Sequence, residues 1–155
     1  MLNRFNFENV KKNLERTYRE LLVLLSNQAQ NYFVDTFTKQ GFNGDPWKEV
    51  QRRDPKTKAY KYPKTRGLQR RTSPILVGAG YKIRGGVLRR AVSTMARTAA
   101  ISNHQLRMIV DLPYAGYLNE GTEKMVKRQF VGQTEELTRM QTTKINEVIL
   151  KIWQA

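Results

Sequence analysis

The chain of 155 residues contains no cysteine and a single histidine, His104. Without cysteine it cannot form a disulfide framework, a thiolate metal site or a cysteine nucleophile, so its fold must rest on packing alone. One histidine cannot supply a two-histidine metal site within one chain. Since His104 falls in a predicted turn, we interpret it as an ordinary solvated residue.

Acidic residues are also scarce, with 13 Asp and Glu in the whole chain. Two pairs, Asp45 with Glu49 and Asp111 with Glu120, have the carboxylates that metal binding or acid-base catalysis needs. Neither pair belongs to a supporting cluster of such residues. We therefore predict no catalytic residue, no metal site and no cofactor, and we expect that the protein is not an enzyme.

Long apolar runs are missing as well. The most apolar stretch, residues 21–25, has five residues, whereas a helix needs roughly 20 to span a bilayer. The first residues lack the basic and then apolar order of a secretory signal. We expect neither membrane insertion nor export by a signal.

Positive charge, by contrast, is abundant. The chain has 28 Lys and Arg against 13 Asp and Glu, a formal net charge of +15. Such an excess attracts polyanions and acidic protein surfaces alike. Its length is that of one ordinary domain, so we predict a single domain over residues 1–155.

Two regions have the period of an amphipathic helix. Apolar residues recur three or four positions apart over residues 7–37 and again from Gln133 to the end. Asn6 is a plausible N-cap of the first helix, and Gly41 with the turn residues 43–46 is expected to end it. The acidic residues of both helices are expected on solvent faces, namely Glu15, Glu20, Glu135, Glu136 and Glu147.

The middle of the chain predicts shorter elements. Residues 75–77 are expected to form a strand and residues 87–92 a short helix. Residues 99–101 and 106–112 predict two strands joined by a polar turn, as the centre of an antiparallel sheet. Residues 114–120 can form another short helix, closed by Gly121. The predicted class is α+β, with long N-terminal and C-terminal amphipathic helices packed on a small antiparallel sheet.

Residues 47–74 show neither helical nor alternating periodicity and predict a long basic loop. Loops of this length inside a compact domain are usually functional or ordered by a partner. The basic segment 48–90 contains fourteen cations and only Glu49 and Asp54 as acids. Its candidate docking residues are Arg52, Arg53, Arg66, Arg70, Arg71, Arg84, Arg89 and Arg90.

The aromatic residues Trp47, Tyr60 and Tyr62 are interleaved with these cations. Aromatic and arginine side chains together are typical of protein interfaces, but they also stack on nucleic-acid bases. Docking on an acidic protein surface is the favoured hypothesis. A nucleic-acid-binding module that uses the basic 48–90 segment is the alternative, and a purely solubilising loop is the third interpretation.

Four blocks of sequence occur in an order that resembles a known family. The first is Phe37-Thr38-Lys39-Gln40-Gly41-Phe42 with Asp45-Pro46-Trp47, and the second is the aliphatic run 75–80 followed by the Leu-Arg-Arg segment 87–92. The third is Tyr-Ala-Gly-Tyr-Leu-Asn-Glu-Gly-Thr at 114–122, and the fourth is Arg-Gln-Phe-Val-Gly at 128–132. Their order and spacing resemble the phage virion morphogenesis family, the Mu-like tail-completion and head-tail joining neck proteins. The similarity to the tail-component proteins of lambdoid phages is more distant.

Two positions depart from the family pattern. Gln129 stands where the family shows proline, and Ala91 stands where serine often follows the Leu-Arg-Arg segment. Within the blocks, we expect four aromatic packing anchors, Phe42, Trp47, Tyr114 and Phe130.

The resemblance implies a structural protein of a tailed-phage virion at the head-tail junction, assembled in the host cytoplasm. Its subunits would form a ring, with a hexamer favoured and a dodecamer as the other copy number. The implied partners are other neck, connector or tail-tube proteins, with non-specific contact to genomic DNA left open and no contact with a membrane.

Overall fold

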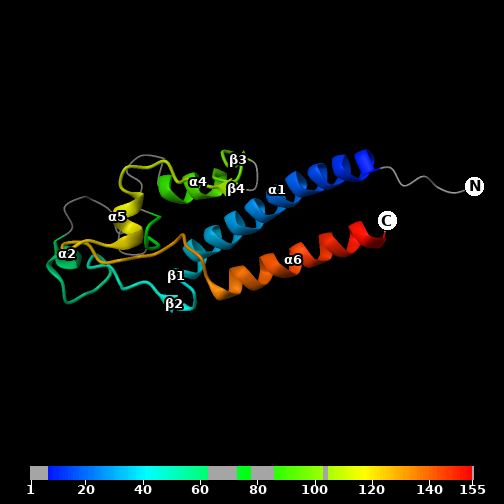
Figure 1. Ribbon diagram of the computed structural model, residues 1–155. Helices are drawn as coiled ribbons and strands as arrows, with labels where there is room; N and C mark the ends of the chain where they lie inside the picture. Colours follow the sequence, from blue (N-terminus) through cyan, green and yellow to red (C-terminus); the bar gives the residue numbers. More distant parts are fainter. Residues whose placement is uncertain (1–6, 63–72, 78–85, 103–104, 155) are drawn as a thin grey trace, which may run out of the picture.

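The computed structural model describes residues 7–62, 73–77, 86–102 and 105–154. Two long helices dominate it, α1 over Phe7–Lys39 and α6 over Glu135–Gln154. They contact each other and run antiparallel, so that α1 begins and α6 ends at the same end of the molecule (Figure 1). The shorter elements lie beside the middle of α1 and at the other end of the molecule (Figure 1). Together these elements confirm the predicted α+β class.

The first helix ends where its predicted turn chemistry begins. Gln40 takes a φ of 52°, which is left-handed and stops the helix, and its carbonyl accepts a hydrogen bond from the Trp47 amide at 2.8 Å. The predicted N-cap, Asn6, lies outside the described residues. The acidic side chains of α1 and α6 that were predicted on solvent faces are all exposed.

A tight hairpin follows α1. Strands β1 (Gly41–Phe42) and β2 (Asp45–Pro46) pair antiparallel across a two-residue turn. In that turn Asn43 has a φ of 53° and Gly44 a φ of 86°, which are the positive values of a type I′ turn. The hairpin turns the chain back toward α1 and delivers Trp47 to the core.

Threonine starts the second long helix. The Thr134 hydroxyl accepts a hydrogen bond from the Leu137 amide at 3.0 Å and donates to the Tyr32 hydroxyl of α1 at 3.1 Å. It therefore caps α6, and Glu135 and Glu136 in the first turn suit the positive end of the helix dipole. The cap also fixes the point at which α6 crosses α1.

Within the described residues, the other helices are short: α2 (Lys58–Lys61), α4 (Val87–Thr94) and α5 (Ala115–Glu120). The sequence predicted α4 and α5, whereas α2 is one turn inside the region predicted as a loop. Gly121 closes α5 with a φ of 80°, and a Cβ there would lie 2.9 Å from the Lys127 amide nitrogen. Glycine is therefore required at this position.

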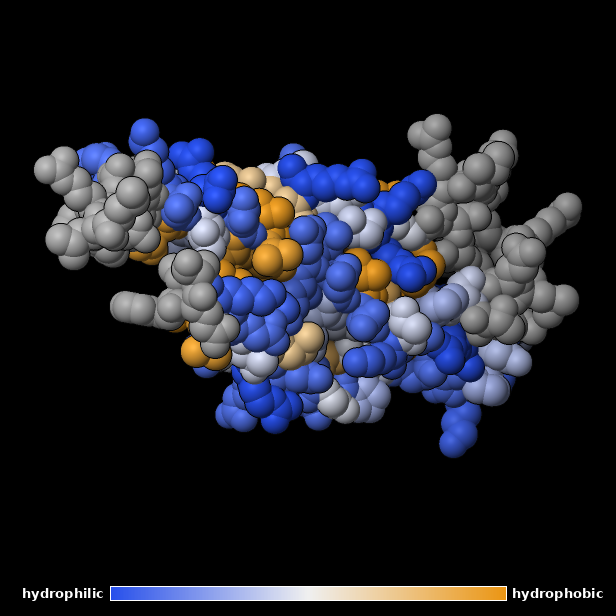
Figure 2. Space-filling view, turned by 90° about the vertical axis from the view of Figure 1, so that its right-hand side faces the viewer, coloured by the Kyte–Doolittle hydropathy of each residue, from blue (hydrophilic) through white to orange (hydrophobic). Residues whose placement is uncertain are grey.

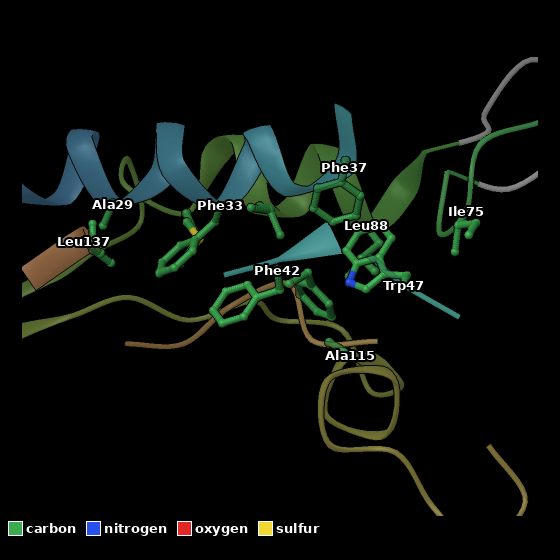
Figure 3. Packing of buried hydrophobic residues seen from close by; sticks show 12 residues of the cluster. Ala29, Phe33, Phe37, Phe42, Trp47, Ile75, Leu88, Ala115 and Leu137 are labelled. Carbon is green, nitrogen blue, oxygen red and sulfur yellow. The ribbon is translucent and has the colours of Figure 1, made fainter. Parts of the chain in front are cut away.

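Aromatic residues form the centre of the core, between α1, the β1–β2 hairpin and α5 (Figure 3). The Phe37 ring lies 5.7 Å, between centroids, from both Trp47 and Phe130. From α4, Leu88 and Val92 close the same cluster and are 3% and 0% exposed. Burying side chains of this size is the main favourable contribution to folding here, at roughly 2 kcal/mol each.

The sequence predictions of strands in the middle of the chain were partly wrong. Residues 75–77 form a turn rather than a strand, because Leu76 has a φ of 59° and the Ile75 amide donates to the Gln40 side chain at 3.2 Å. Strands β3 (Ala100–Ser102) and β4 (Gln105–Arg107) form a hairpin where two strands were predicted, but β4 ends at Arg107, so residues 108–112 of the predicted strand 106–112 are not in a strand. The hairpin is a separate and largely exposed two-stranded sheet instead of a sheet centre.

Candidate interaction surface

The loop after the hairpin is tied to the segment that precedes α6. The Trp47 indole Nε1 donates to the Gln129 carbonyl at 2.6 Å, across 82 residues of sequence. In return, the Arg128 guanidinium donates twice to the Lys48 carbonyl, at 3.2 and 3.1 Å. Burial lowers the pKa of Arg128 below its ordinary value, while the nearby Glu49 carboxylate opposes the shift. Hydrogen bonds therefore directly join the first and the last of the four blocks that resemble the phage family.

Asn119 joins the third block to the fourth. Its side-chain oxygen accepts hydrogen bonds from the backbone amides of Phe130 at 3.0 Å and Val131 at 3.1 Å. The Arg128 amide donates to the Leu118 carbonyl at 2.9 Å, one residue earlier. These contacts place the Phe130 ring in the core.

Two of the predicted docking arginines make hydrogen bonds within the chain. Arg52 donates to the carbonyls of Ser73 and Pro74, both at 3.0 Å. Arg53 donates to the Gln40 side chain at 3.0 Å and pairs with Glu49 at 3.5 Å. Both guanidinium groups therefore hold the loop to the body of the protein. Apart from Glu49, which is four residues before Arg53, these partners are distant along the chain, so the sequence could not show the contacts.

The other predicted docking residues have different outcomes. Arg89 and Arg90 are exposed on α4. The other four, Arg66, Arg70, Arg71 and Arg84, lie outside the described residues. His104 does so as well.

Three of the four predicted packing anchors are buried, and one is exposed. Phe42, Trp47 and Phe130 are buried, at 9%, 7% and 1% exposure. Tyr114 was predicted wrongly, since it is 41% exposed. It precedes α5, whose buried residue at this end is Ala115, and it lines an open cavity of about 390 Å³ together with Arg52 and Arg128.

Exposed cations cluster around α2, at the end of the molecule farthest from the start of α1 (Figure 1). Lys56, Lys58 and Lys61 are exposed, and Tyr62 beside them is 77% exposed. We call these four residues the α2 patch. The Thr57 hydroxyl accepts from the Tyr60 amide at 3.3 Å and so caps the turn that displays them. Cations around an exposed aromatic ring suit docking on an acidic protein surface.

Charge is divided unequally between two parts of the molecule. We call residues 29–134 the head, and residues 7–28 of α1 together with α6 the stalk. The head contains twenty Lys and Arg against seven Asp and Glu, whereas the stalk contains seven against six. Within the stalk, Lys144 donates to the Glu147 carboxylate and lowers its pKa below the ordinary value. Nearly all of the surplus positive charge is therefore in the head.

No group of three or more His, Asp or Glu side chains that could hold a metal ion occurs in the described part of the chain. Over the same residues, no helix has the length and apolar character needed to cross a membrane.

Comparison with protein-family models, with curated proteins and with solved structures finds no match to this chain. The similarity to phage neck proteins thus stays a prediction from the sequence.

Proposed function

We propose that this chain is a non-enzymatic structural subunit of a tailed-phage virion, a neck or tail-completion protein that works as one member of a ring. Its head docks on an acidic surface of a neighbouring neck, connector or tail-tube protein. The α2 patch supplies that contact.

One observation carries the proposal. Three of the four blocks that resemble phage neck proteins are hydrogen-bonded in the head: Trp47 and Arg128 join the first block to the fourth across about eighty residues, and Asn119 joins the third to the fourth. A resemblance spread over unrelated surface positions would have no such common site. The bonding supports the view that the blocks specify one structural unit, whose outer side presents cations.

Charge reversal at the α2 patch tests the docking step. We expect Lys56→Glu, Lys58→Glu and Lys61→Glu together to abolish incorporation into virions, while the purified chain stays folded. A matched control makes the same charge change elsewhere, at Arg97, Arg107 and Arg139, which are also exposed. Incorporation is measured by supplying each variant to a phage that lacks the native copy. Equal incorporation of both triple variants would contradict the proposal.

The alternative is a nucleic-acid-binding module, which the concentration of positive charge in the head favours. Such binding neutralises phosphates and releases counterions, so its affinity falls steeply as salt rises. If the purified chain shows no measurable DNA binding at about 50 mM salt, this alternative is excluded.

A further inference from the structure

The stalk leaves much of its apolar surface uncovered. In the predicted apolar stripe of α6, Leu137 is buried, but Met140 and Ile149 are 37% and 43% exposed. Leu150 next to them is 58% exposed. On α1, Val23 and Leu24 are 46% and 48% exposed. Figure 2 looks at this end of the molecule and shows apolar patches among hydrophilic side chains. Exposed apolar patches rimmed by polar residues often mark an interface.

Part of this surface is concave. A groove of about 700 Å³ lies between α1 and the β3–β4 hairpin, with Val23, Leu24 and Ile101 as its apolar lining. Arg19 and Glu20 line it as well, and they contribute one charge of each sign. The groove therefore fits an apolar ridge whose flanking residues carry both charges.

The outer end of α6 has such a ridge. Ile149 and Leu150 are flanked by Glu147 and Lys151, which again carry one charge of each sign. This ridge cannot fill the groove of its own chain. Tyr32 contacts Thr134 where the helices cross, so residue 150, sixteen positions further along antiparallel α6, lies opposite about residue 16 of α1. That is about 12 Å along the helix from Leu24.

Charge decides which molecule can occupy the groove. A nucleic acid, an anionic membrane or an acidic protein would be drawn to the head, with its twenty cations against seven acids. The stalk is almost neutral, and it is the part of this strongly basic chain on which another copy can pack without net repulsion. We propose that the groove of one copy receives the Ile149–Leu150 ridge of a second copy.

This contact is heterologous, because groove and ridge are different surfaces of the same chain. When the same contact is repeated, each copy binds the next one in a row. The row closes into a ring when the rotation between neighbouring copies permits it. The inference rests on the proposed function, to which it adds the contact that holds the ring together. The contact uses the β3–β4 hairpin of the head but leaves the α2 patch free for the neighbouring protein.

Single cysteines test the contact directly, because the native chain has none. One preparation carries Leu24→Cys and another Leu150→Cys, and both positions are exposed. We expect a disulfide-linked dimer when the two are mixed under mild oxidation, and little dimer from either alone. A two-fold contact would instead link Leu24→Cys to itself. Within one chain, the separation of about 12 Å exceeds the Cα distance that a disulfide spans.

Native mass spectrometry provides the second measurement. Leu150→Glu places a charge on the ridge, and we expect it to convert the oligomer of the native chain to monomer. Tyr117→Glu is the matched control, since Tyr117 is 61% exposed but lies on the head. Circular dichroism of both variants is used to check that they are folded.

The outcomes separate this contact from the proposed function. A native chain that is monomeric at all concentrations, or a Leu150→Glu variant that keeps the oligomer, would overturn the contact. Virions that incorporate the Leu24→Cys and Leu150→Cys chains together but form no 24–150 disulfide on oxidation would also overturn the contact and leave the proposed function standing. Cross-linked oligomers that never enter virions would support the contact and contradict the function.

Discussion

At Asn119, one side-chain oxygen satisfies two backbone amides that would otherwise lack a partner near the core. Leaving a buried amide without an acceptor costs about 1–3 kcal/mol. The residue therefore matters for the position of Phe130 and of the whole segment before α6. No periodicity in the sequence singles it out, since its role depends on a segment eleven residues away.

We expect Asn119→Ala to lower the free energy of unfolding by about 2 kcal/mol, because both amides lose their acceptor. Asn119→Asp keeps an acceptor oxygen and should restore most of the loss. Urea unfolding at neutral pH measures both variants, with Asn146→Ala on the exposed face of α6 as the control. Equal losses for Asn119→Ala and Asn119→Asp would show that the oxygen is not what matters.

Elements with their own local signal were predictable from sequence. Regular apolar spacing located α1 and α6, and Gly41 with the Asn43–Gly44 turn located the end of α1. The segment 75–77 was not predictable in the same way. Its β-branched residues favour a strand, but the Gln40 side chain and Arg52 hold it in a turn. Long-range polar contacts thus overrode local propensity.

The same limit applied to the candidate site. Arg52 and Arg53 appeared as docking cations because a run of basic residues does not reveal which of them find internal acceptors. The α2 patch was within the predicted loop, and only the structure distinguishes its exposed lysines from those arginines.

The β1–β2 hairpin permits a test of turn chemistry. Gly44 has a φ of 86° with no atom near its missing Cβ, so Gly44→Ala adds backbone strain without a steric clash. We expect a loss of about 1 kcal/mol in the free energy of unfolding. Asn43→Gly, at a φ of 53°, should change stability by much less, because asparagine and glycine both tolerate this region. Thermal or urea unfolding distinguishes the two.

On the scale of the whole molecule, the division of charge gives two activities with opposite salt dependence. Binding of the head to an acidic partner or polyanion weakens as salt screens the attraction. Association through the stalk should strengthen, because the same salt screens repulsion between basic heads. We expect sedimentation of the purified chain to show larger species at 0.5 M than at about 0.05 M salt, the range over which the Debye length shrinks severalfold. Oligomers that dissociate as salt rises would contradict association through the stalk.

The bond between the Trp47 indole and the Gln129 carbonyl spans 82 residues, and this spacing bears on how the protein is made. During translation, α1 and the β1–β2 hairpin leave the ribosome long before Phe130 does. Until then their aromatic side chains have no complete cluster to enter, so the nascent chain carries an open core over that whole interval. We expect the head to complete its core only after Phe130 has emerged.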